Sequence, residues 1–199
     1  MTADFPLAPG DPLHHRRRLR TQAIAAREAL SAAQRAALTE RIEGALDLLV
    51  ADLAPSVLAF CWPHRGEPDL RAWVMRWLAV DARRRAALPV VLDKATPLVF
   101  RRWTPGEAMP LDLYGIPHPA AGEHLCPELL LVPLNAFDRK GYRLGYGGGY
   151  FDRTLAATRA VAVGVGFELG RAESVLPQPH DRAMDWIVTE AGAFRAPPR

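Results

Sequence analysis

The segment from Arg143 to Arg153 brings together residue types that can bind phosphate and a metal ion. Its four glycines allow a loop to adopt positive φ and to turn successive N–H groups toward one concavity, a nest that favours anions. Asp152 follows the nest directly, where Mg²⁺ carrying the phosphates of ATP would need an oxygen ligand. Each flanking arginine can add charge-assisted hydrogen bonds worth about 1.5–3 kcal/mol. We therefore expect a phosphate site that opens onto the N-terminus of a helix.

The same glycines are also compatible with a turn that binds nothing. No Gly-x-x-x-x-Gly-Lys-Ser/Thr pattern is present, and Gly145 and Gly147 lack the third glycine of the dinucleotide fingerprint. Composition alone therefore leaves open a tight strand-to-helix turn without a ligand.

A helix expected over residues 13–30 carries positive charge beside its buried face. Apolar residues at helical spacing define that face, namely Leu19, Ala23, Ala26 and Leu30. Arg16, Arg20 and Arg27 form a second stripe directly beside it. A solvated face, a nucleic-acid patch, and a pocket reached by Arg16 and Arg20 all remain open on this pattern.

Two further candidates follow a short apolar strand expected at residues 56–61. Trp62 offers a flat surface suited to an aromatic ring, and Glu67 lies between Gly66 and Pro68, which would hold its carboxylate in one direction. In open α/β sheets, ligands bind beyond the carboxyl ends of the strands. The alternatives are core packing for Trp62 and an exposed loop position for Glu67.

Acidic residues elsewhere in the chain have several possible roles. A turn over residues 177–181 carries Asp181 as one fixed acid, next to His180. His180 has the chemistry of a general base, but the sequence shows no nucleophile paired with it. Asp138 precedes the glycine segment, and we expect it to form a turn rather than to support the loop.

The elements that must position these residues alternate between helix and strand. Further helices are expected over 31–53, 70–80 and 151–158, and further strands over 86–92, 98–103, 129–133, 160–167 and 186–189. Residues 104–128 are rich in proline and glycine, which indicates a long ordered loop that partly forms a lid or pocket wall. The pattern predicts an α/β fold, a mixed or mostly parallel sheet with helices on both faces.

Bulk composition narrows the class of protein. A chain of 199 residues with 49% hydrophobic content can bury the core of one domain, expected over 13–199 after a disordered leader at 1–12. The formal net charge of +3 favours an anionic ligand by steering. Two cysteines are too few for a disulfide framework or a zinc site. Because we see neither a secretory signal nor a membrane-length apolar run, we expect a cytoplasmic protein.

Taken together, residues 132–138 and 141–153 resemble the signature of the 5-formyltetrahydrofolate cyclo-ligase (5,10-methenyltetrahydrofolate synthetase) family. Other pieces follow in family order: an Arg-x-x-Leu-Arg helix start, Pro-x-Arg-Gly-Glu, Leu-Pro-Val-Val, Tyr-Gly-Ile-Pro and a terminal Pro-x-x-His-Asp. The resemblance covers about Arg16 to Glu190. The family fold, a single-domain three-layer α/β/α sandwich, agrees with the pattern of elements.

The resemblance implies an ATP- and Mg²⁺-dependent cyclisation of 5-formyltetrahydrofolate to 5,10-methenyltetrahydrofolate, with release of ADP and phosphate. In the family mechanism the formyl oxygen attacks the γ-phosphate, N10 then closes the ring, and phosphate leaves. An amide oxygen is a poor nucleophile, so catalysis must come largely from alignment and from spreading charge off the transferring phosphoryl group. The partner would be a small-molecule folate, with or without a polyglutamate tail, bound by a monomer; no nucleic acid and no membrane is expected.

The resemblance also assigns roles to matching positions. Catalysis would involve Arg143, Tyr150 and Asp152, and Mg²⁺ would be held by Asp152 and Asp181. ATP would be bound by Arg16, Arg20, Arg143, Leu144, Gly145, Tyr146, Gly147, Gly148, Gly149, Tyr150 and Phe151. The folate would be bound by Trp62, Glu67, Tyr146, Gly147, Gly148, Gly149 and Tyr150.

Three positions depart from common family residues. Arg16 stands where many members carry lysine, which keeps the charge but changes reach and geometry. Gly148 stands where some members place a lysine, so we expect Arg143 and Arg153 to meet the phosphate charge there. Phe151 replaces a frequent tyrosine and removes one hydroxyl.

Two other functions compete with a cyclo-ligase. A non-catalytic relative could bind folate or nucleotide without turnover, but the intact acids Asp152, Asp181 and Glu67 argue against it. A nucleic-acid-binding protein could use residues 16–18 and 83–85, and it would bind with steep salt dependence. The absence of regularly interleaved aromatic residues weakens that alternative.

Overall fold

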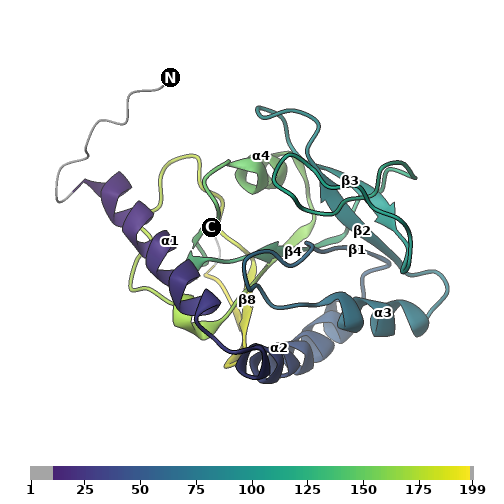
Figure 1. Ribbon diagram of the computed structural model, residues 1–199, viewed down its shortest axis with the longest axis horizontal. Helices are drawn as coiled ribbons and strands as arrows, with labels where there is room; N and C mark the ends of the chain where they lie inside the picture. The colour runs from purple at the N-terminus through teal and green to yellow at the C-terminus, as the bar shows by residue number, and fades with distance from the viewer. Residues whose placement is uncertain (1–10, 198–199) are drawn as a thin grey trace.

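The computed structural model describes residues 11–197, which form three layers with a mixed sheet between helices (Figure 1). Seven strands run in the order β3-β2-β1-β4-β7-β8-β9. Their bounds are β1 Val57–Ala59, β2 Arg85–Val90, β3 Val99–Trp103, β4 Leu129–Pro133, β7 Val161–Val165, β8 Trp186–Thr189 and β9 Gly192–Arg195. The five inner strands are mutually parallel, and β3 and β9 pair antiparallel at the two edges. The prediction of an α/β fold with a mixed, mostly parallel sheet is therefore confirmed.

Helices cover both faces of this sheet. In Figure 1, α2 (Ala32–Leu53) and α3 (Arg71–Ala79) lie below it, and α4 (Tyr150–Ala157) lies above it. The first helix, α1 (Pro12–Glu28), runs along one side, where it contacts β5 (Ala136–Phe137) and a 3-10 turn, η1 (Glu168–Gly170). The strand β5 pairs with β6 (Arg143–Leu144) in a separate small hairpin that leads into the glycine segment.

The start of α2 follows from its sequence. The Ser31 hydroxyl accepts a hydrogen bond from the Gln34 N–H at 3.1 Å, and the Gln34 side chain accepts one from the Ser31 N–H at 2.8 Å. This capping box satisfies two N–H groups that a helix start would otherwise leave unpaired. The helix ends at Leu53, and the next residue, Ala54, adopts a left-handed conformation immediately before Pro55.

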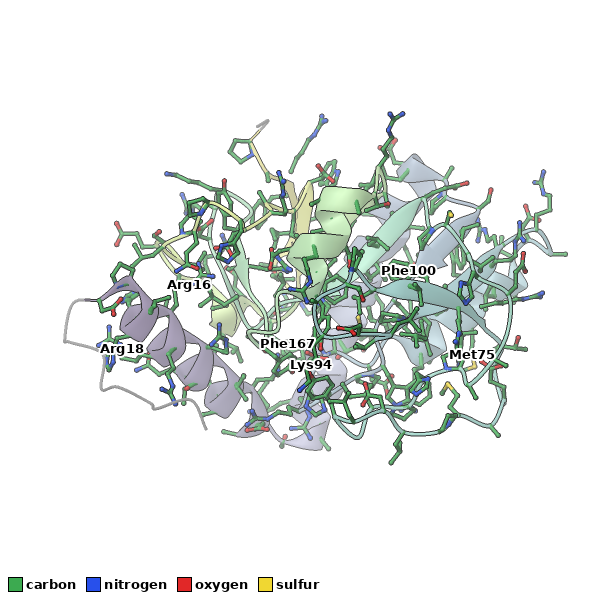
Figure 2. All side chains as sticks on the ribbon, turned by 90° about the horizontal axis from the view of Figure 1, so that it is seen from above. Arg16, Arg18, Met75, Lys94, Phe100 and Phe167 are labelled. Carbon is green, nitrogen blue, oxygen red and sulfur yellow. The ribbon has the colours of Figure 1, made fainter. Side chains whose placement is uncertain are left out.

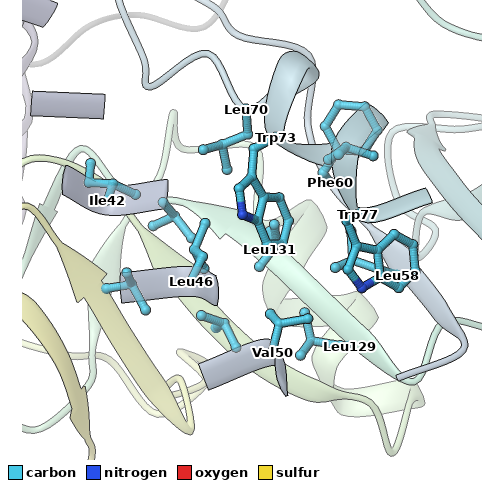
Figure 3. Packing of buried hydrophobic residues seen from close by; sticks show 14 of the residues in the cluster. Ile42, Leu46, Val50, Leu58, Phe60, Leu70, Trp73, Trp77, Leu129 and Leu131 are labelled. Atoms are coloured by element: carbon cyan, nitrogen blue, oxygen red, sulfur yellow. The ribbon is translucent and has the colours of Figure 1, made fainter. Parts of the chain in front are cut away.

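Apolar side chains fill the space on both sides of the sheet. Figure 3 shows Ile42 and Leu46 of α2 and Trp73 of α3 packed against strand residues that include Leu58 and Leu131. Leu155 of α4 belongs to a second cluster on the opposite face. Each such side chain contributes about 1.5–3 kcal/mol on burial, so the two clusters hold the strand ends, and the loops beyond them, in place.

The first helix differs from its prediction in three respects. It begins at Pro12, because Asp11 accepts a hydrogen bond from the Leu13 N–H and caps it, and it ends at Glu28. Its buried residues are Ala23, Ile24 and Arg27, whereas Ala26 is exposed, so the predicted apolar stripe was wrong at residue 26. The rest of the predicted leader, residues 1–10, lies outside the described part of the chain.

The short strands β5, β6 and β9 were not predicted, while the other strands lie within the predicted ranges or begin one residue earlier. Within residues 11–197, no helix combines the length and apolar content needed to cross a membrane. The division into a leader and a single domain at 13–199 stays a prediction.

Candidate functional site

A cavity of about 610 Å³ opens where the loops that follow β1 and β4 meet α1 and the start of α4. It lies at the carboxyl ends of parallel strands, as expected for an open α/β sheet. Nearly all the predicted site residues line it: Arg16, Arg20, Trp62, Glu67, Arg143, Gly145, Tyr146, Gly147, Gly148, Gly149, Tyr150, Phe151, Asp152 and Asp181. Leu144 does not, because its side chain is buried in a small apolar cluster with Ala23 and Val175.

The glycine segment forms a loop between β6 and α4 in which two positions require glycine. Gly147 has a φ of 100° and Gly149, the N-cap of α4, has a φ of 66°, and L side chains rarely adopt either conformation. At Gly148 a Cβ would lie 2.7 Å from the Tyr150 ring, so a side chain at this position would require that ring to move. The loop therefore presents backbone to the cavity, as the nest interpretation requires.

Arg153 does not have the position that we expected. Its Nη2 donates to the carbonyl oxygens of Lys94 at 2.8 Å and Gly148 at 2.9 Å, and its guanidinium lies 5.0 Å from the Tyr150 ring centroid. It is not among the residues that line the cavity. Its charge is thus bonded to backbone carbonyls beside the glycine loop, and its contact with phosphate stays a prediction.

Arg143 and Asp152 form a partly buried ion pair in the cavity wall. Arg143 Nη1 donates to Asp152 Oδ1 at 3.0 Å, and the Arg182 N–H donates to the same oxygen at 3.1 Å. The Arg143 side chain is only 4% exposed, and its Nε is buried without an acceptor among residues 11–197. An unmet donor at this wall is compatible with an anionic ligand.

Arg16 of α1 and Asp181, which lie far apart in the sequence, form a second ion pair. Arg16 Nη1 lies 2.6 Å from Asp181 Oδ2 and also donates to the Leu176 carbonyl at 2.9 Å. Burial raises the pKa of Asp181, but hydrogen bonds from Arg16 and from the Gln178 N–H outweigh it, so this pKa lies below its usual value. Figure 2 shows Arg16 on the inner side of α1 and Arg18 on its outer side. Arg16 thus belongs to the pocket, which resolves the alternatives left open for it.

Arg20 reaches the glycine loop from α1. Its Nε donates to the Gly145 carbonyl at 2.6 Å, and its guanidinium lies 3.8 Å from where a Gly147 Cβ would stand. Burial, together with the nearby charges of Arg16 and Arg17, lowers the pKa of Arg20. A cluster of partly desolvated cations such as this is stabilised by an anion.

Two carboxylates of this pocket are candidate ligands for a metal ion. Among residues 11–197, no group of three or more His, Cys, Asp or Glu side chains is arranged to hold a metal ion. Asp152 and Asp181 nevertheless line the same cavity. Mg²⁺ commonly binds through one or two carboxylates plus substrate phosphates and water. The donor set therefore fits a metal ion that arrives with a nucleotide rather than one held by the protein alone.

Glu67 is buried and hydrogen bonded on both oxygens. The Tyr146 hydroxyl donates to Oε1 at 2.8 Å, and the His64 N–H donates to Oε2 at 3.0 Å. Burial raises the pKa of Glu67, while Arg27, Tyr146 and the His64 N–H each oppose that rise. The alternative of an exposed loop acid is therefore wrong. Burial beside Glu67 also raises the pKa of Tyr146, so its hydroxyl keeps its proton and remains a donor.

Aromatic side chains form the apolar part of the cavity. Trp62 is half-buried and packs edge-on against Trp103 at a centroid distance of 6.5 Å, with the Arg71 guanidinium 4.6 Å from its ring centroid. Across the cavity, the loop over residues 104–128 contributes Tyr114, whose hydroxyl lies 3.1 Å from that of Tyr150. The prediction that this loop partly forms a pocket wall is confirmed.

The surroundings of His180 and Asp138 favour structural roles over catalytic ones. His180 is exposed, and its Nε2 lies 3.8 Å from Asp181 Oδ1. Asp138 is buried and accepts hydrogen bonds from the N–H groups of Lys140 and Tyr142 through Oδ1, and from that of Val175 through Oδ2. It therefore forms the predicted turn and also fixes the segment that leads to Asp181.

Sequence reasoning missed one residue that connects these parts. Arg27 of α1 is buried and donates to the Tyr146 hydroxyl and to the backbone carbonyls of Arg65 and Leu134, which belong to the loops after β1 and β4. The available signal was its place in the same stripe as Arg16 and Arg20. Asp112 and Tyr114 were also missed, although the Tyr-Gly-Ile-Pro turn had been singled out.

Comparisons with known proteins point to one family. A sequence model of the 5-formyltetrahydrofolate cyclo-ligase family matches residues 13–190. The chain is 31% identical over 185 residues to the "5-formyltetrahydrofolate cyclo-ligase" of Mycolicibacterium smegmatis, which covers 86% of this chain and 91% of that protein. It is 30% identical over 176 residues to the protein of the same name from Haemophilus influenzae, which covers 83% of this chain and 91% of that protein.

A solved structure is similar over almost the whole chain. The NMR structure of Aquifex aeolicus 5,10-methenyltetrahydrofolate synthetase matches with a TM-score of 0.79 and 28% sequence identity, covering 92% of this chain and 94% of that one.

Proposed function

Because the chain belongs to the 5-formyltetrahydrofolate cyclo-ligase family, we propose that its cavity binds 5-formyltetrahydrofolate together with ATP and Mg²⁺ and closes the folate ring at the expense of ATP. As a member of this family the protein is an enzyme, a ligase that acts on a folate. The ATP and Mg²⁺ dependence, the mechanism and the residue roles are the proposal.

One observation carries the proposal: Tyr146 connects the glycine loop, which lies beside arginines, to the buried carboxylate of Glu67. Tyr146 belongs to the loop through its backbone, next to Gly145 and Gly147, and it bonds to Glu67 through its hydroxyl. A nucleotide phosphate on the loop and a folate near Glu67 would therefore meet within one cavity. The reaction requires this, since the formyl oxygen must lie in line with the γ-phosphate.

The proposed reaction has two bond-forming steps. The formyl oxygen attacks the γ-phosphorus and ADP leaves. The formyl oxygen, otherwise a poor leaving group, is thereby converted into a phosphate ester. N10 then attacks the activated formyl carbon and loses its proton, and phosphate departs with the former formyl oxygen. Arg16, Arg20 and Arg143 would bind phosphate oxygens, and Tyr150 would border the transferring group at the start of α4. Fixed cations of this kind stabilise charge that spreads over the phosphoryl oxygens.

Asp152 and Asp181 would hold Mg²⁺. When bound, the ion would neutralise charge on the β- and γ-phosphates. In the unliganded chain both carboxylates bond to arginines of the same cavity. Binding of nucleotide with metal would replace each ion pair by two new interactions, arginine with phosphate and aspartate with metal.

A spectrophotometric assay tests the function. Purified protein is mixed with 5-formyltetrahydrofolate and Mg²⁺, with and without ATP, and the absorbance of the methenyl product is followed. We expect an ATP-dependent rise that disappears with EDTA, together with one ADP per product. Binding of both ligands to folded protein without ADP would instead indicate a non-catalytic relative.

The remaining properties are proposed on the same basis. We expect a cytoplasmic monomer that accepts folates with or without a polyglutamate tail. Sedimentation of the purified protein and a comparison of KM for mono- and polyglutamylated substrate would test these expectations.

A further inference from the structure

Arg27 stands behind the cavity wall and bonds to three separate pieces of it. Nε donates to the Arg65 carbonyl at 2.9 Å, Nη1 to the Leu134 carbonyl at 3.2 Å, and Nη2 to the Tyr146 hydroxyl at 2.9 Å. These acceptors belong to the loop after β1, the loop after β4 and the glycine loop. The residue is only 2% exposed and does not line the cavity, so it touches no ligand directly.

The chemistry of the guanidinium determines the direction of the neighbouring hydrogen bonds. Arginine has donors and no acceptor, so the Tyr146 oxygen must accept from Arg27 and keeps one proton to donate. That proton has two possible acceptors, Glu67 Oε1 at 2.8 Å and the His64 carbonyl at 3.4 Å. The shorter distance and the charge of the carboxylate favour Glu67. Arg27, Tyr146 and Glu67 thus form one directed chain of hydrogen bonds.

We propose that Arg27 is a positioning residue that aligns the Glu67 carboxylate with the glycine loop through Tyr146, and so couples the folate side of the cavity to its nucleotide side. This inference rests on the proposed function and names a residue to which that function assigned no role. Arg27 Nη2 also lies 3.9 Å from Glu67 Oε1, close enough to favour the ionised carboxylate.

Removing this cation should change the pH at which Glu67 loses its proton. The charged or titratable side chains associated with Glu67 are Arg27 from α1, Tyr146 from the glycine loop and Cys61 from its own loop. Burial already raises the pKa of Glu67, and the thiol and the phenol stay neutral because burial beside this carboxylate raises their pKa values as well. Arg27 is therefore a nearby positive charge that favours the ionised form of Glu67, which accepts hydrogen bonds through both oxygens.

The adjacent residue offers a matched control. Glu28 makes an ion pair with Arg65 at 2.7 Å, which ties the same turn of α1 to the same loop. This pair is on the surface, where its side chains are 41% and 45% exposed. Glu28→Gln therefore weakens the contact between α1 and the loop without touching the buried hydrogen bonds.

The experiment measures equilibrium binding of 5-formyltetrahydrofolate and of a non-hydrolysable ATP analogue with Mg²⁺, by calorimetry from pH 5.5 to 8.5. The proteins are wild type, Arg27→Met, Arg27→Lys, Tyr146→Phe and Glu28→Gln. We expect Arg27→Met to weaken both ligands by roughly tenfold or more, with folate affinity falling further as the pH is lowered from 8.5. Arg27→Lys should restore the pH profile, since it restores the charge, but only part of the affinity. Glu28→Gln should stay within about twofold of wild type.

The outcomes separate the two proposals. If wild type binds no folate, the proposed function fails. If wild type binds it and Arg27→Met leaves affinity and pH profile unchanged, the positioning role alone fails. If Arg27→Met does not fold, Arg27→Lys decides: the role is supported if Arg27→Lys weakens both ligands while Glu28→Gln does not, and it is refuted if Arg27→Lys binds both ligands as tightly as wild type.

Discussion

Four charged side chains of the cavity form two ion pairs in the unliganded chain. Arg16 with Asp181 and Arg143 with Asp152 each pair a cation proposed to bind phosphate with an acid proposed to bind Mg²⁺. Burying such a pair removes both ions from water, and losing one partner leaves the other uncompensated. Single substitutions at these positions therefore need controls that separate loss of function from loss of stability.

Asp152→Asn should abolish Mg²⁺-dependent turnover and leave the fold intact. An asparagine oxygen can still accept hydrogen bonds from Arg143 and from the Arg182 N–H, but it is a poor ligand for Mg²⁺ because it carries no charge. Initial rates across Mg²⁺ concentrations and circular dichroism of the same samples would check this. Asp81→Asn, which breaks a surface pair with Arg83, is the control. Full activity in Asp152→Asn would refute the metal assignment.

Glu67→Gln should weaken folate binding by roughly tenfold or more and should weaken ATP binding far less. Glutamine can still accept the Tyr146 hydrogen bond but loses the charge that would attract donors of the folate ring. Calorimetry with each ligand separately measures the two effects. Equal losses for both ligands would contradict the proposed division of the cavity.

The Asp181 pair should also be visible in the pH dependence of stability. Its native pKa lies below the unfolded value of 3.8, so ionised Asp181 stabilises the native state above that value. This contribution is lost as the pH falls through the lowered native pKa. Asp181→Asn should therefore be less stable than wild type at pH 6, and the difference should shrink at pH 3. Urea unfolding at both pH values tests this, and a constant difference would argue against the linkage.

At the scale of elements, a glycine turn anchors the hairpin β5–β6 to the segment before β8. Gly141 has a φ of 84°, and a Cβ there would lie 2.6 Å from the Ala196 Cβ and 2.9 Å from the Met184 carbonyl oxygen. The Gly141 carbonyl in turn accepts a hydrogen bond from the Met184 N–H at 2.9 Å. The turn therefore needs glycine for two separate reasons, backbone conformation and close packing.

Gly141→Ala should destabilise the protein by about 1–3 kcal/mol more than Gly106→Ala. Gly106 has the same φ of 84° but nothing within 4 Å of its Cβ position, so the difference isolates the packing clash from the backbone strain. Chemical unfolding of both variants measures it. Equal losses would mean that backbone conformation alone requires glycine at residue 141.

Local sequence patterns predicted the elements well, because each depends on neighbours in the chain. The capping box at Ser31 and Gln34 and the apolar runs of β4 and β8 are signals of this kind. The strands β5 and β6 are two residues long, too short to show alternation, and exist because they pair with each other. Ala26 was misplaced because the buried face of α1 is turned toward the polar contacts of Arg27.

The sequence predicted which residues form the site but not which residues they contact. A resemblance assigns residue types to positions, whereas Arg27 contacts residues 38, 107 and 119 positions away, which no local pattern reveals. The same holds for Arg153, whose bonds to Lys94 and Thr96 depend on how residues 94–96 pass the glycine loop. Pairing between distant segments is set by the whole fold.

At the scale of the molecule, ligand binding should slow hydrogen exchange in several loops that are distant in sequence. The loop holding Glu67, the glycine loop and the turn at residues 177–181 line one cavity, so a nucleotide with Mg²⁺ and a folate would order all three. Hydrogen exchange should slow in these segments on ligand addition, while α3, which does not line the cavity, serves as internal control. Protection limited to one loop would contradict a single shared site.

The ion pair of Arg16 and Asp181 has a consequence for biosynthesis, because the two residues are 165 positions apart. A chain emerging from the ribosome can form α1 early, yet it has no counter-ion for Arg16 until almost the whole domain has been made. The central strand β4 likewise gains its neighbour β7 only about thirty residues after its own synthesis. Incomplete molecules therefore cannot assemble the cavity, and a ligand that binds in it would stabilise finished chains only.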